Sequence, residues 1–92
     1  MWTITKDHIE GTTKYSAVGV VGPRSATLTS EEIKAAGHHF KMYDDDGELY
    51  YEGYCTNNTD ERAFAPLDQF GTPNAGCTGI KYRGASGKYE WL

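Results

Sequence analysis

Cysteine and histidine are the side chains of this 92-residue chain with the most versatile chemistry. A cysteine nucleophile needs a histidine base and a carboxylate that orients the base. The chain contains candidates for all three roles: Cys55, Cys77, His38, His39 and Asp68. However, no spacing places two of them on one turn, since there is no Cys-x-x-Cys or His-x-x-x-His pair. We therefore predict no catalytic, cofactor-binding or metal-binding residue, and a small metal-dependent or cysteine-dependent enzyme remains an alternative.

The segment Asp44-Asp45-Asp46-Gly47 has the composition of a calcium loop. With Gly47 at the sixth position of an EF-hand loop, the first and twelfth positions fall on Met42 and Gly53, which supply no carboxylate. The segment is therefore predicted to be a charged hairpin turn, with a weak exposed site for a divalent ion as the alternative.

Acidic residues are concentrated in the middle of the chain, which carries a net charge of -4. Residues 43–61 contain seven acidic residues and no lysine or arginine. Affinity for a phosphate backbone comes mostly from lysine and arginine. We therefore expect no direct binding of nucleic acid.

Tyrosines accompany these acids. In an alternating strand, Tyr50 and Tyr54 share a face with Glu52, and Tyr43 joins them from the preceding strand. Tyrosine on an exposed, polar sheet face is typical of a protein contact surface. The predicted binding residues are Tyr43, Asp44, Asp45, Asp46, Glu48, Tyr50, Glu52 and Tyr54, and the expected partner is a protein with a basic surface. The alternative is that another segment covers this face and the tyrosines are packing residues.

These residues depend on a predicted β-hairpin over 40–55, with Asp-Asp-Gly as its turn. A second hairpin is predicted from strands 78–83 and 88–92. Earlier in the chain, residues 2–5 and 15–21 have strand patterns, with a turn at 10–13 and a break at Gly22-Pro23.

A short helix is predicted to begin after Thr29, because Glu32 stands at the spacing of a capping box. Gly37 is predicted to end it. Residues 56–76 are predicted to be a long loop with one helical turn at 66–70, pinned to the core by Phe64, Leu67 and Phe70. The fold class is α+β: a single domain over 1–92 with an antiparallel sheet of five or six strands and one short helix.

The chain has no apolar run long enough to span a membrane, and its first residues lack the pattern of a signal peptide. We therefore expect a cytoplasmic protein that does not bind membranes. Its two cysteines are expected to be reduced, although a single bridge between them remains open.

Two stretches, Tyr-Asp-Asp-Asp-Gly-Glu at 43–48 and Pro-Asn-Ala-Gly at 73–76, lie in a region of 40–83 that resembles a family of short uncharacterised proteins from actinobacteria, their plasmids and their phages. The resemblance implies no activity and no site residues. It implies a bacterial or phage cytoplasmic context and a small accessory or regulatory protein.

The expected function is therefore that of a non-enzymatic accessory protein that binds a partner protein through its acidic, tyrosine-rich hairpin. Besides the enzyme, two further classes remain open. One is a phage inhibitor that mimics the charge of DNA, and the other is a self-associating protein that pairs through open sheet edges.

Overall fold

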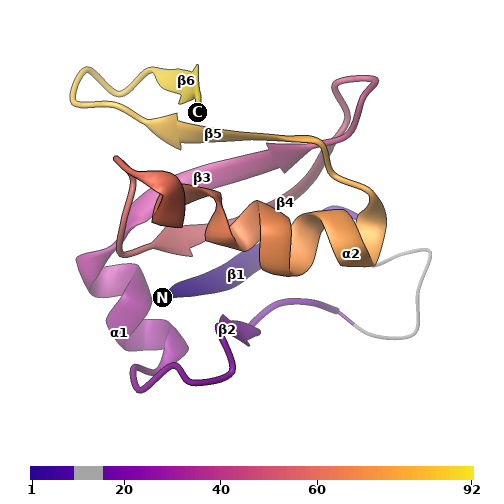
Figure 1. Cartoon of the computed structure of the whole chain (residues 1–92). Coiled ribbons are helices and arrows are strands. Elements are labelled where there is room, and N and C mark those ends of the chain that lie inside the picture. Colours follow the sequence, from indigo (N-terminus) through magenta and orange to yellow (C-terminus); the bar gives the residue numbers. More distant parts are fainter. Residues whose placement is uncertain (10–15) are drawn as a thin grey trace.

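The computed structural model describes residues 1–9 and 16–92, which form one six-stranded antiparallel sheet beside short helices (Figure 1). The order across the sheet is β2-β1-β4-β3-β5-β6. The strands are β1 (Trp2–Asp7), β2 (Val21–Gly22), β3 (His38–Tyr43), β4 (Leu49–Cys55), β5 (Gly79–Arg83) and β6 (Tyr89–Trp91). This architecture confirms the predicted α+β class.

Both predicted hairpins are present, as β3 with β4 and as β5 with β6. Because β4 and β5 are each antiparallel to β3, they run in the same direction on either side of it. A chain that joins two such strands has to cross the sheet. Figure 1 shows the helical segment between them, coloured red to orange, running across the sheet.

The helical turn predicted at 66–70 is present, but the rest of this segment is more helical than the predicted long loop. The segment contains the 3₁₀ helix η2 (Glu61–Phe64), the π-helical turn η3 (Leu67–Gly71) and the helix α2 (Thr72–Ala75). Leu67 is buried and Phe70 packs against the core, whereas Phe64 is 37% exposed and does not pin the segment. The Tyr82 hydroxyl instead ties β5 to η2 by donating to the Ala63 carbonyl oxygen at 2.7 Å.

The main core lies between this segment and one face of the sheet, which we call the core face. Its largest fully buried side chains come from β1, β3 and β5, and include Ile4, Phe40, Met42 and Ile80. In the central strand β4, Gly53 lies opposite both Ile4 and Phe40. A Cβ atom built on Gly53 would lie 2.0 Å from the Thr3 carbonyl oxygen, so the sheet packs here only around a glycine.

The helix α1 (Ser30–Ala36) packs against β1 and β4 and buries Ile33. Its capping box is confirmed: the Glu32 amide donates to Thr29 Oγ1, and the Thr29 amide donates to Glu32 Oε1. Gly37 ends the helix as predicted. The Ser30 and Thr3 hydroxyls are 2.5 Å apart, which places α1 on the side of β1 opposite Trp2 and Ile4.

Side chains do not alternate strictly between the two faces along β1 and β4, because each of these strands contains a bulge. The registers of β1 with β4 and of β3 with β4 each shift by a residue, between Ile4 and Lys6 and between Met42 and Tyr43. Tyr50 is left out of the β3–β4 register and packs against the core, which corrects its predicted place beside Tyr54.

Two predictions fall near the start of the chain. The strand predicted over 15–21 is mostly wrong: residues 16–20 are not in a strand, and only Val21 lies in β2, which ends at Gly22 before Pro23. The turn predicted at 10–13 lies outside the described residues. Within the described residues, none of the helices is long and apolar enough to span a membrane.

Candidate functional site

The second face of the sheet, which we call the outer face, is partly covered by α1 and elsewhere carries polar and aromatic side chains. Strand order brings four basic residues from three strands onto it: Lys6 of β1, Lys41 of β3, and Lys81 and Arg83 of β5. Glu52 of the central strand β4 lies among them and pairs with Lys6 and Lys41 in the register. The face therefore has a mixed charge, although the sequence around Glu52 is acidic.

Glu52 is 8% exposed and lies between two histidines. Its Oε2 atom is 2.6 Å from His8 Nε2, and its Oε1 atom is 3.3 Å from His39 Nε2. The other ring nitrogen of His39, Nδ1, is 2.6 Å from the Tyr89 hydroxyl. These four side chains link the residue after β1 with β4, β3 and β6 across the outer face.

The environment of His39 favours its neutral form. Burial lowers the pKa of His39, the Glu52 carboxylate acts in the opposite direction, and Arg83, Lys41 and Lys6 lower the pKa further. A carboxylate beside Nε2 favours the tautomer with its hydrogen on that nitrogen. Nδ1 is then the acceptor of the Tyr89 hydroxyl hydrogen.

An aromatic cluster lies near the other end of the outer face. The rings of Tyr43 and Trp91 meet edge to face with their centroids 5.2 Å apart. Lys81 Nζ lies 4.4 Å from the centroid of the Trp91 ring and 5.1 Å from that of Tyr43. Trp91 also packs over Gly79, where a Cβ atom would be 2.7 Å from the indole. Trp91 is nevertheless 58% exposed, so a large aromatic surface faces the solvent at a fixed position.

The acidic turn between β3 and β4 follows Tyr43 directly. Asp44 Oδ1 accepts the amides of Asp46 and Glu48, each at 2.9 Å. These amide donors, with the Glu48 amide as the largest influence, lower the pKa of the Asp44 carboxyl. Gly47 has a φ of 79°, which the turn requires and which glycine adopts without strain. The turn holds Asp45, Asp46 and Glu48 exposed beside Tyr43.

The eight predicted binding residues therefore divide into three groups. Tyr43 adjoins the acidic turn and its four acids, as expected. Glu52 and Tyr54 lie farther along the outer face, where both approach His39: Glu52 through its carboxylate, and Tyr54 with its ring centroid 5.0 Å from that of the imidazole. Tyr50 packs against the core, and a hydrogen bond to Asp44 raises the pKa of its phenol.

Sequence reasoning missed Trp91 and Tyr89. Their alternation around Glu90 indicates a common face, but only the pairing of β5 with β3 brings that face beside Tyr43 and His39.

The two cysteines are free and buried. Burial raises the pKa of the Cys77 thiol to about 11, with a smaller contribution from the Asp44 charge. At pH 8 a thiol with that pKa is ionised to about one part in a thousand. The protonated thiol is a poor nucleophile, so the structure offers no support for catalysis by Cys77.

We expect the cysteines of the native protein to react slowly with a thiol reagent at pH 8, and to react fully once urea exposes them. The measurement is the rate of reaction with Ellman's reagent, with the Cys55→Ser variant used to isolate Cys77. Reaction of native Cys77 at the rate of a free thiol would contradict this assignment.

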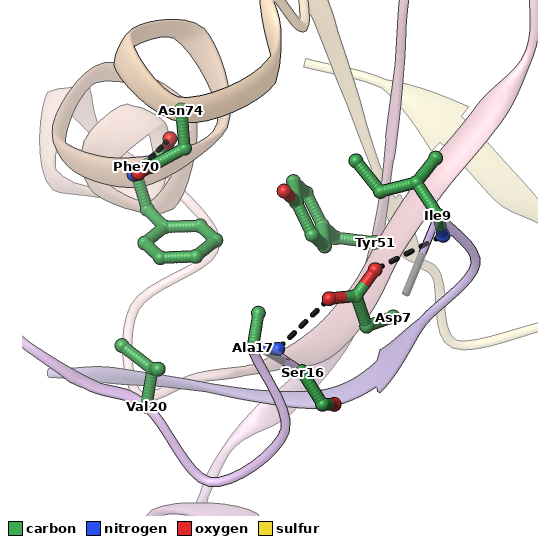
Figure 2. Close-up of a pocket in the computed structure, with 8 residues that line it drawn as sticks. All are labelled: Asp7, Ile9, Ser16, Ala17, Val20, Tyr51, Phe70 and Asn74. Carbon is green, nitrogen blue, oxygen red and sulfur yellow. Dashed lines mark hydrogen bonds between the residues drawn. The ribbon is translucent and has the colours of Figure 1, made fainter. Parts of the chain in front are cut away.

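Neither a metal cluster nor a catalytic cavity is evident in the described part of the chain. No group of three or more His, Cys, Asp or Glu side chains there could hold a metal ion. A cavity of about 290 Å³ lies between β1, β4 and η3, with Phe70 and Tyr51 on its walls (Figure 2). Its carboxylate, Asp7, already accepts the amides of Ile9 and Ala17, at 3.0 and 2.8 Å. The Asp7 carboxylate therefore fixes the backbone at Ile9 and Ala17, which is a structural role.

Comparisons of the chain with protein-family models, with curated proteins and with solved structures find no significant match. The resemblance to short actinobacterial and phage proteins therefore remains an expectation.

Proposed function

We propose that this protein is a non-enzymatic binding module that contacts a basic protein surface through one end of its outer face. The contact surface, which we call the tip surface, consists of Tyr43, Asp45, Asp46, Glu48 and Trp91. The observation that carries the proposal is the exposed Trp91, which Tyr43 and Gly79 hold at a fixed position.

Tryptophan and tyrosine are enriched among the residues that dominate protein interfaces. Trp91 already contacts Tyr43, Lys81 and Gly79 without a partner, which reduces the side-chain entropy that association would cost. The Tyr43–Trp91 pair therefore has the properties of an aromatic anchor.

Charge favours a basic partner. Asp45, Asp46 and Glu48 are exposed, and no salt bridge within the described residues involves them. Lys81, which is close to the aromatic pair, lies over the rings. Complementary charge around an aromatic centre accelerates association and orients the partner. The same carboxylates would repel a nucleic-acid backbone from this surface.

The test is capture of a partner from an actinobacterial lysate with variants that change the tip surface. We expect Trp91→Ala with Asp46→Lys to reduce capture of the same protein at least tenfold, because a dominant interface residue contributes about 2 kcal/mol or more. The matched control is Phe64→Ala with Glu31→Lys, which makes the same kinds of change at exposed positions on η2 and α1.

Circular dichroism would confirm that both variants remain folded. Equal capture by the two variants would contradict the proposal. Capture that nuclease treatment abolishes would also contradict it, because the captured species would then be a nucleic acid.

A further inference from the structure

A pocket of about 350 Å³ lies at the opposite end of β3 from the acidic turn. We call it the strand-end pocket. It is lined by His38, His39, Asn58 and Arg83, together with Gly37 and the Gly84–Ala85 turn. Four segments of the chain meet there: the start of β3, the loop after β4, the end of β5 and the β5–β6 turn.

The lining of this pocket is basic in a chain of net charge -4. None of the described residues that line it is an aspartate or a glutamate. The acidic turn follows Tyr43, the last residue of β3, and the pocket lies at His38, the first residue of β3, so the six-residue strand separates the two. At about 3.3 Å per residue this separation is roughly 20 Å. The separation exceeds the screening length of about 8 Å in physiological salt, so the turn has little influence on the pocket. The nearer carboxylate, Glu52, contacts the lining residue His39 and is shared with His8.

Three hydrogen-bond donors of the pocket have no partner in the described part of the chain. The Arg83 guanidinium forms no salt bridge there, and the side chains of His38 and Asn58 form no hydrogen bond there. His39 differs, because Tyr89 contacts one of its ring nitrogens and Glu52 the other. Both ring nitrogens of His39 thus already have partners. Arg83 and His38 are exposed and Asn58 is half-buried, so their donors are open to water or to a ligand.

We propose that the strand-end pocket binds the phosphate group of a phosphomonoester or of inorganic phosphate. Arg83 presents a planar fork of N–H donors that matches two phosphate oxygens, and such bonds are among the strongest in proteins. His38 and Asn58 line the same pocket and carry further hydrogen-bond donors. Ligand sites begin at about 300 Å³, so the volume of this pocket is at the lower end of their range. It accommodates a phosphate together with a small organic group esterified to it.

This site is independent of the tip surface. The test is an NMR titration of the ¹⁵N-labelled protein at constant ionic strength with inorganic phosphate, phosphoserine, or serine with chloride. We expect saturable shifts at residues 38, 58 and 83–85 with the two phosphate-bearing probes and none with serine and chloride.

Arg83→Gln is expected to weaken phosphate binding at least tenfold, and His38→Gln to weaken it less. Arg24→Gln, which changes an exposed arginine elsewhere, is the matched control and is expected to bind like the unchanged protein. Tighter binding of phosphoserine would identify a phosphorylated side chain as the ligand, whereas tighter binding of inorganic phosphate would identify the free ion.

Shifts that grow linearly with phosphate, that spread over all basic residues, or that persist in Arg83→Gln would overturn the proposal. The backbone spectrum of each variant reports directly whether it is folded, so loss of binding can be separated from loss of structure.

Discussion

Replacing Gly53 with alanine is expected to destabilise the fold strongly. The added Cβ atom would lie 2.0 Å from the Thr3 carbonyl oxygen and 2.8 Å from Phe40 Cζ. Since Gly53 pairs with both neighbouring strands, neither can move away without breaking its register. We expect a loss of about 3 kcal/mol or more, the upper range for an overpacked core. Urea denaturation followed by circular dichroism measures the effect.

Gly84→Ala is the matched control, because its Cβ atom would approach nothing closer than the Lys88 carbonyl oxygen at 3.4 Å. Surface changes of this kind usually alter stability by about 0.5 kcal/mol or less. Equal urea midpoints for the two variants would show that β1, β4 and β3 do not pack as described.

Glu52→Gln is expected to destabilise the protein at neutral pH and to make it more sensitive to acid. The change removes the negative charge that faces His8 and His39 on the outer face. Loss of a hydrogen bond to a charged group costs about 2 kcal/mol. The unfolding free energies of the variant and the unchanged protein at pH 7.5 measure this difference.

The sensitivity to acid follows from the direction of the His39 pKa shift. Because folding lowers the pKa of His39, its neutral form stabilises the fold above the unfolded pKa of about 6.5. That stability is lost as the pH falls through the folded pKa. In Glu52→Gln the opposing influence of the carboxylate is gone, so the pKa of His39 falls further and the loss between pH 7.5 and 5.5 becomes larger.

Two further variants separate these contributions. His39→Gln is expected to reduce the dependence of stability on pH in this window, and the exposed Glu90→Gln is expected to leave it unchanged. The lowered pKa values of Glu32, Asp44 and Asp60 have their effect below about pH 4, outside the window. An unaltered slope in both Glu52→Gln and His39→Gln would contradict the role of this pair.

Local signals in the sequence were sufficient to predict most of the elements. Thr29, Glu32 and Gly37 define α1 through contacts within a few residues, and the Asp-Asp-Gly turn defines the β3–β4 hairpin in the same way. Of the helical crossing over 61–75, only one turn at 66–70 was predicted, because Pro66 and Pro73 are loop signals in a sequence. Packing of Ala63 and Leu67 against the sheet stabilises it in spite of them.

The candidate site was only partly predictable, because it depends on which strands are neighbours. Counting charges along the chain assigns Glu52 to an acidic surface, but the sheet places it between His8 and His39 and beside lysines of two other strands. In the same way, Trp91 and Tyr43 are distant in sequence and meet only because β5 pairs with β3. Such long-range pairings leave no local pattern.

The position of β1 inside the sheet has a consequence for how the chain folds. The neighbours β3 and β4 are joined by a short turn and can pair early, since contacts between residues close in sequence form fastest. β1 pairs with the edge of β4 that faces away from β3, with Trp2 opposite Cys55. The ribosome therefore adds about fifty residues after β1 before β4 is complete. During synthesis β1 therefore has only the two-residue strand β2 as a partner until β4 follows. We expect the β1–β4 pairing to form later than the β3–β4 hairpin.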